Sequence, residues 1–148
     1  MGEADITLQF GPFEGSEEHR RVLSTARVRK WISHALEKPG EIAVRIVGAE
    51  EGRELNRQYR RKDYATNVLT FDYESGPVVV ADLVLCGPVV EREAQQQGKS
   101  LEAHYAHLLV HGALHAQGFD HESGDSGALE MEALEILLLG ALGYENPY

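Results

Sequence analysis

The segment from residue 111 to residue 121 constrains the fold most strongly, because it combines three histidines with a helix-ending glycine. His111 and His115 are four residues apart, so on a helix their imidazoles lie on the same face, one turn apart. Gly118 can adopt the left-handed conformation that ends a helix, which lets the chain turn back and bring His121 to the same place. The pattern therefore predicts a helix that ends beside a cluster of three ring nitrogens.

Three histidine ligands with a fourth position open to water are typical of catalytic zinc, whereas structural zinc usually has four protein ligands. The spacing therefore predicts that His111, His115 and His121 hold one divalent metal ion, expected to be zinc. The alternative is that these are ordinary polar residues of a helix, and His104 and His107 farther up the same face support it. Those two lie before the helix end, so we expect packing or hydrogen bonds to the ligands from them, not ligation.

The same histidine spacing occurs in metzincin proteases, which carry a glutamate directly after the first histidine as the general base. Here Gly112 takes that position, and glycine cannot accept a proton. Met131 could imitate the methionine turn of those enzymes, although core packing on the last helix is the simpler interpretation. The spacing alone therefore does not predict a protease.

Composition predicts one globular domain over residues 1–148, with 43% apolar residues to form its core. The chain has no run of the roughly 20 apolar residues that a membrane helix needs. Its acidic start lacks the basic segment of a signal peptide, so we expect a cytosolic protein. Cys86 is the only cysteine, which excludes an intrachain disulfide and predicts a small buried residue.

The chain has a negative net charge, but one segment of it is rich in basic residues. The net charge is −10, from 14 basic and 24 acidic residues, which argues against a surface that coats nucleic acid non-specifically. Positive residues nevertheless concentrate in one short stretch, at Arg53, Arg57, Arg60, Arg61 and Lys62. A local basic face is therefore compatible with the acidic total.

Strand-like and helix-like segments alternate along the chain, with no repeat and no linker long enough to separate domains. Strands are predicted at residues 5–10, 41–47, 66–73 and 78–86. Helices are predicted from residue 16 up to Pro39, and at residues 50–60, 88–97, 101–117 and 126–142. The expected fold is α+β, a small mixed four-stranded β-sheet packed by about five helices, with the metal site at the C-terminal end of a helix.

Three carboxylates are candidates for a supporting role near the metal. Asp82 interrupts an otherwise apolar strand, and a buried acid is costly unless something pairs with it. Asp120 and Glu122 flank His121, where either could accept a proton or orient a ligand. A turn residue and a solvated carboxylate are equally good interpretations of these two.

Several segments resemble the YbeY endoribonucleases, which are bacterial factors of ribosomal RNA maturation. The resemblance covers nearly everything from Leu55 to the C-terminus, with mild departures at Ala81 and at Ala116-Gln117. The matching segments are Leu55-Asn56, Tyr59-Arg60-Arg61-Lys62-Asp63, residues 66–71 (TNVLTF), residues 82–86 (DLVLC), the histidine segment, residues 93–99 and residues 130–135.

The resemblance implies a zinc-dependent, single-strand-specific endoribonuclease that acts in ribosomal RNA processing, including 16S rRNA 3′-end maturation, and in ribosome quality control. It implies that the three histidines bind zinc and that Arg60 is the basic residue that faces the metal cleft. A guanidinium suits this role because it can hold phosphate oxygens in a bidentate grip. The implied partners are ribosomal RNA, the small ribosomal subunit with one of its proteins, and the Era GTPase. Neither a membrane nor DNA is an expected partner.

In this hypothesis zinc lowers the pKa of its bound water and polarises the scissile phosphate, while Arg60 holds the phosphate. The nucleophile is either the metal-bound hydroxide or the 2′-hydroxyl of the RNA, and the sequence does not distinguish them. Two other classes of function remain at this point, a zinc-dependent amidase or peptidase and a non-catalytic, metal-stabilised ribosome-assembly factor. A peptidase should cleave peptides and leave RNA intact, whereas an assembly factor should bind ribosomal particles equally well after Arg60→Ala.

Overall fold

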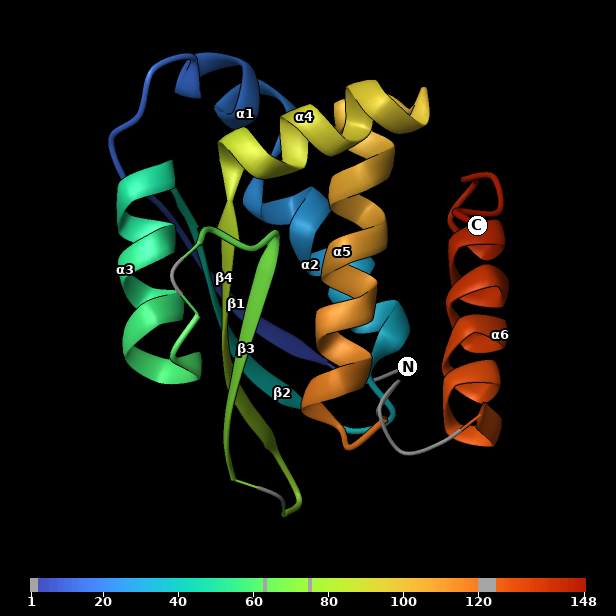
Figure 1. The fold of residues 1–148 in the computed structure, drawn as a ribbon. Coiled ribbons are helices and arrows are strands. Elements are labelled where there is room, and N and C mark those ends of the chain that lie inside the picture. Colours follow the sequence, from blue (N-terminus) through green and yellow to red (C-terminus); the bar gives the residue numbers. More distant parts are fainter. Residues whose placement is uncertain (1–2, 63, 75, 120–124) are drawn as a thin grey trace.

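The structure, a computed structural model, describes residues 3–62, 64–74, 76–119 and 125–148 (Figure 1). One four-stranded sheet forms its centre, in the order β1-β2-β4-β3. The strands are β1 (Ala4–Phe10), β2 (Gly40–Val47), β3 (Val68–Glu74) and β4 (Val79–Cys86).

The sheet is mixed because its last strand runs the other way. β1 pairs with β2, and β2 with β4, in parallel, whereas β3 pairs with β4 antiparallel. β3 pairs on one side only, so its outer edge faces away from the sheet. The predicted four-stranded mixed sheet of an α+β fold is confirmed, and each predicted strand overlaps an observed one.

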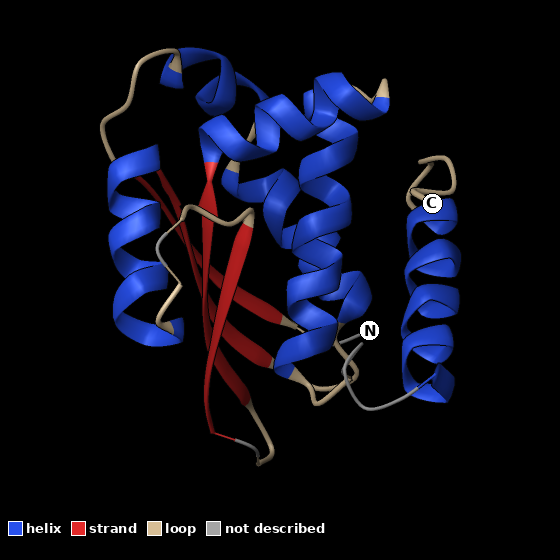
Figure 2. Ribbon diagram, viewed as in Figure 1, coloured by secondary structure: helices blue, strands red, loops and turns tan. Residues whose placement is uncertain are grey.

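Helices cover both faces of the sheet (Figures 1 and 2). α3 lies over one face, and α2 and α5 lie over the other. α6 packs on α5 from outside, and α1 and α4 lie at the end where β1 and β4 finish. The helices of the described residues are α1 (Ser16–Val22), α2 (Thr25–Ala35), α3 (Ala49–Arg60), α4 (Gly87–Gln97), α5 (Leu101–Ala116) and α6 (Asp125–Ala141).

The first predicted helix is in fact two helices. The chain leaves helical geometry at Leu23 and Ser24, both of which have extended backbone angles. The Ser24 hydroxyl accepts a hydrogen bond from the backbone amide of Arg27, 3.1 Å away, which caps a new helix. The prediction of one continuous helix up to Pro39 was therefore wrong, and the described part of the chain contains six helices where about five were expected.

The core lies between the sheet and the helices on both faces. Trp31 and Tyr105 are the largest of its fully buried side chains. Cys86 and Met131 are buried too, as predicted for a small apolar residue and for a core residue of the last helix. None of the helices in the described residues has both the length and the apolar content that a bilayer span needs.

Candidate active site

Helix α5 carries two of the three predicted ligands into one cleft. His111 and His115 lie one turn apart, with 6.3 Å between their ring centroids. The helix ends as predicted, because Gly118 has a left-handed φ of 99°. The amides of Gly118 and Phe119 donate to the carbonyl oxygens of His115 and Leu114, which closes the last turn.

The third predicted ligand, His121, and the candidate bases Asp120 and Glu122 lie outside the described residues. Among the residues that the structure does describe, no group of three or more His, Cys, Asp or Glu side chains is placed to hold a metal ion. A fit to zinc can therefore be tested only on His111 and His115. Two imidazoles one helical turn apart in the same cleft are a donor pair that suits zinc.

Glu135 of α6 is a fully buried carboxylate that forms a hydrogen bond with one of these two histidines. It accepts hydrogen bonds from His111 Nδ1 (3.0 Å), from His107 Nε2 (3.2 Å) and from the Tyr148 hydroxyl (2.7 Å). Burial alone would raise the pKa of Glu135, but the hydrogen bonds from His107, His111 and Tyr148 outweigh it and hold the pKa well below its usual value. With the Nδ1 proton directed at Glu135, the lone pair of His111 lies on Nε2, the nitrogen that a metal would use.

A second carboxylate organises the wall of the cleft. His104 is 2% exposed, and its Nε2 donates to Glu93 Oε1 at 2.9 Å. The same oxygen accepts from Asn67 Nδ2 at 3.1 Å, and Asn67 Oδ1 accepts from the amide of Val68 at 2.7 Å. This network joins α4, α5 and the start of β3. His104 and His107 thus form hydrogen bonds, but their partners are the carboxylates Glu93 and Glu135 and not the predicted metal ligands.

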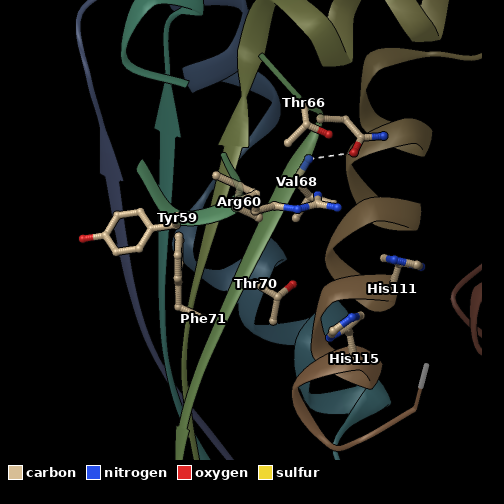
Figure 3. A pocket seen from close by; sticks show the side chains of 10 residues that line it. Tyr59, Arg60, Thr66, Val68, Thr70, Phe71, His111 and His115 are labelled. Carbon is tan, nitrogen blue, oxygen red and sulfur yellow. Dashed lines mark hydrogen bonds between the residues drawn. The ribbon is translucent and has the colours of Figure 1, made fainter. Parts of the chain in front are cut away.

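Arg60 is the last residue of α3 and lines the same cleft as His111 and His115. Figure 3 shows its guanidinium directed toward α5, where both histidines lie. Within the described part of the chain Arg60 forms no ion pair, whereas Arg57, one turn earlier, pairs with Glu54. The Arg60 guanidinium is therefore available to an anionic ligand in the cleft.

The position of Arg60 depends on how the chain leaves α3. Arg61 has a left-handed φ of 58°, and its amide donates to Arg57 O, which ends the helix. Asn56 is fully buried, and its Nδ2 donates to the carbonyl oxygen of Tyr64 at 2.7 Å. This hydrogen bond fastens the loop after α3 to the helix and so fixes one side of the cleft.

The cleft has a volume of about 520 Å³ and runs along the outer edge of β3. A smaller pocket of about 150 Å³ continues past His111, between His107 and Tyr148. The residues that line the main cleft are Tyr59, Arg60, Thr66, Asn67, Val68, Leu69, Thr70, Phe71, His111 and His115.

The chain is similar to known proteins along nearly its whole length. Residues 14–143 match the family model described as Endoribonuclease YbeY. The chain belongs to the YbeY family. Two curated relatives named endoribonuclease YbeY cover the whole chain. The one from Polaromonas sp. (strain JS666) is 68% identical, with 96% of its own length covered, and the one from Polaromonas naphthalenivorans is 62% identical, with 98% covered.

A solved structure supports the fold. The solution structure of the protein TM1509 from Thermotoga maritima has a TM-score of 0.57 at 23% identity. The match covers 93% of this chain and 91% of that one. The four-stranded sheet with its helices is thus an arrangement already found in a solved protein.

The two departures from the YbeY pattern affect packing. Gln117 Oε1 accepts from the amide of Glu37 at 2.9 Å, and its Nε2 donates to Ala35 O at 2.7 Å, which ties the end of α5 to α2. Ala81 is 1% exposed within the core. Neither residue is among those described as lining the cleft.

Asp82 lies on the other face of the sheet from the histidines. It is cross-strand partner to Phe71, and its neighbour Leu83 points toward Gly112 on α5, so the Asp82 side chain points away from that helix. Its partner is Tyr73, whose hydroxyl donates to Asp82 Oδ2 at 2.7 Å. Asp82 is not among the described residues that line the cleft, so the prediction that it supports a metal ligand finds no support here.

Gly112 faces the sheet and not the cleft. A Cβ atom at this position would lie 3.0 Å from Leu83 Cδ2 and 3.2 Å from Leu83 Cδ1. In this fold, the residue that follows the first histidine therefore packs against β4. A glutamate there would enter the core, which argues against a metzincin-like peptidase.

Proposed function

We propose that this protein is a zinc-dependent endoribonuclease that cleaves single-stranded ribosomal RNA, in 16S rRNA 3′-end maturation and in ribosome quality control. The observation that carries the proposal is the cleft in which Arg60 faces His111 and His115. The YbeY family and the name endoribonuclease of its curated members point to the same reaction.

The proposed metal ligands are His111, His115 and His121. By accepting a hydrogen bond from His111 Nδ1, Glu135 would leave Nε2 of that ring to bind the ion. When bound, a divalent ion of this kind supplies a Lewis acid for the phosphate and lowers the pKa of a coordinated water. The side chains of the protein have to hold the phosphate in place beside the ion.

Arg60 has the charge and the reach to hold the scissile phosphate. Its guanidinium can donate two parallel hydrogen bonds to phosphate oxygens, a geometry that a lysine cannot reproduce. Charge that builds on those oxygens during cleavage is stabilised by a cation already in place. Arg60 therefore acts on the substrate, while the histidines act on the ion.

Protein partners complete the proposal. With a net charge of −10, the chain has little general attraction for a polyanion. Docking on the small ribosomal subunit, through one of its proteins and the Era GTPase, would bring the RNA to the cleft. We therefore propose that this cytosolic enzyme binds free RNA weakly and depends on such partners for its affinity.

The test compares metal content and cleavage of ribosomal RNA fragments in four proteins, namely wild type, His115→Ala, Arg60→Ala and Arg57→Ala. We expect His115→Ala to lose metal, and Arg60→Ala to retain metal but to cleave roughly a hundredfold more slowly or worse. Arg57→Ala is the matched control, because it removes a guanidinium from the same helix, outside the described cleft lining. Wild-type cleavage by Arg60→Ala would show that the phosphate assignment is wrong.

The same proteins separate the alternatives. A peptidase would cleave peptides while the RNA fragments stay intact. A non-catalytic assembly factor would cleave neither, and Arg60→Ala would bind ribosomal particles as wild type does. A 2′-deoxy nucleotide at the cleavage site then distinguishes the two modes of attack, because continued cleavage there excludes attack by the 2′-hydroxyl.

A further inference from the structure

Tyr59 is an exposed aromatic residue that lines the cleft directly beside Arg60. It is 63% exposed, comparable to Tyr73 at 64%, but unlike Tyr73 it is among the described residues that line the cleft. The ring contacts Phe71 of β3 edge to face, with 5.0 Å between centroids and 71° between planes. This contact restrains the ring while much of its surface stays open to solvent.

The side chains of Tyr59 and Arg60 point in opposite directions from the end of α3 (Figure 3). Their Cα atoms are about 3.8 Å apart because the residues are consecutive. Figure 3 shows the Arg60 guanidinium directed toward α5, and the Tyr59 ring beside Phe71, with its hydroxyl pointing away from the cleft. A polynucleotide held at a phosphate by Arg60 could therefore pass over the edge of β3 and bring a neighbouring base to Tyr59.

A fixed aromatic face next to a phosphate-binding cation is the usual means of binding single-stranded nucleic acid. The cation holds the backbone, and the ring stacks on a base of any sequence, because every base has a π-face. The chain has a net charge of −10, which repels a polyanion. An aromatic contact therefore adds affinity for RNA that charge alone does not supply.

We propose that Tyr59 is the stacking platform for an unpaired nucleobase next to the phosphate held by Arg60. The inference rests on the proposed function and deepens it, because it names what selects single-stranded RNA. In a duplex each base is paired and stacked between its neighbours, so it cannot offer its face to Tyr59 without leaving the helix. Selection by this residue is for unpaired bases, with purines favoured by their larger rings.

The test uses three variants of the full-length, metal-loaded protein. Tyr59→Leu removes the flat ring but keeps apolar cover over Phe71, and Tyr59→Phe keeps the ring. Tyr73→Leu is the matched control, because Tyr73 is 64% exposed on β3 but is not among the described residues that line the cleft. Metal content should match wild type in all three, and the thermal midpoint should match in both Tyr59 variants, which separates a local effect from misfolding. Tyr73→Leu also removes the hydrogen bond to Asp82, so a lower midpoint is expected there and this control is read on RNA binding.

Binding is read with a single-stranded 2′-O-methyl RNA that carries one 2-aminopurine, whose fluorescence is quenched on stacking. We expect wild type, Tyr59→Phe and Tyr73→Leu to quench it, and Tyr59→Leu to bind roughly ten- to a hundredfold more weakly with the quench lost. In cleavage assays Tyr59→Leu should raise KM for single-stranded RNA, with little change in kcat, and should lower the ratio of kcat/KM between single-stranded and duplex RNA.

Two outcomes separate this inference from the proposed function. If Tyr59→Leu binds, quenches and discriminates as wild type does, Tyr59 only covers Phe71 and the inference is overturned while cleavage stands. If the quench depends on Tyr59 but no protein cleaves RNA, the base site is supported and the nuclease proposal fails.

Discussion

The Nδ1 atom of His111 lies 3.0 Å from Oε1 of Glu135, which joins a predicted metal ligand on α5 to a fully buried carboxylate on α6. A carboxylate that receives the Nδ1 proton sets the tautomer and the orientation of the ring. The same carboxylate also accepts from His107 and Tyr148, so one buried charge organises the inner wall of the site. The histidine pair therefore depends on a helix that follows it in the chain.

Glu135→Gln should weaken metal binding roughly 10- to 100-fold, because an amide orients the His111 ring less strongly than a carboxylate does. The measurement is the zinc dissociation constant, from competition with a chelating dye, which does not depend on activity. Glu130→Gln is the control, because Glu130 lies exposed on the same helix. Equal zinc affinity in wild type and Glu135→Gln would show that Glu135 does not position the ligand.

Gly112→Glu, which restores the residue found in metzincins, should destabilise the protein and create no peptidase. The new side chain would enter the space of Leu83 and bury a carboxylate, at a cost of roughly 1–3 kcal/mol or more. Urea unfolding and a peptide-cleavage assay measure the two effects. Gly140→Glu is the control, because nothing lies within 4 Å of a Cβ atom there. Peptide cleavage by a stably folded Gly112→Glu would contradict this account of α5.

Asn56→Ala should cost roughly 1–3 kcal/mol of stability, because it removes the hydrogen bond from the fully buried Asn56 amide to the Tyr64 carbonyl oxygen. Cleavage should fall as well, since the loop after α3 helps to place Arg60, while zinc content should not change. Urea unfolding, RNA cleavage and metal analysis on one preparation test all three effects. Gln58→Ala, an exposed amide of the same helix, should change none of them. A loss of zinc in Asn56→Ala would contradict the proposal that α3 positions the phosphate-binding Arg60 while α5 carries the metal ligands.

The free energy of unfolding should fall as the pH drops below about 6.5, in part because of His19. This residue is 1% exposed, and burial lowers its pKa below the ordinary 6.5 against the raising effect of Glu91. The unfolded chain therefore binds a proton at a higher pH than the folded chain does, so acid favours unfolding. Tyr105 is its second partner, 2.6 Å from Nδ1.

Urea unfolding of chelator-treated protein at several pH values between 5 and 8 tests this. His19→Gln should be less stable at neutral pH but should lose less stability on acidification. His34→Gln, on α2, is the control and should keep the wild-type slope. An unchanged slope in His19→Gln would show that His19 does not carry the effect.

Some features of the site follow from local sequence signals. The helix that carries His111 and His115 ends at Gly118 because glycine reaches the left-handed φ without steric cost, and the observed angle agrees. The alternation of strands and helices follows from apolar periodicity. The break between α1 and α2 also had a local signal, the capping residue Ser24, which was outweighed by the apolar period on both sides.

Other features required the tertiary structure. Glu135 and His111 are 24 residues apart in the sequence and lie on different helices. No local pattern specifies which carboxylate will be buried beside His111. Asp82 was rightly expected to need a partner, but its face of the sheet, and hence Tyr73 as that partner, depends on how β4 packs against α5.

The sequence by itself determined most of the local backbone, that is, where the strands and most of the helices lie, where α5 ends and which histidines share its face. These features depend on residue conformations and on spacing within a few turns. The tertiary structure decided what those side chains meet, including the buried carboxylate behind His111, the position of Arg60 opposite the histidines and the contact of Tyr59 with Phe71. Such contacts join distant segments, and their geometry is set by packing of the whole core.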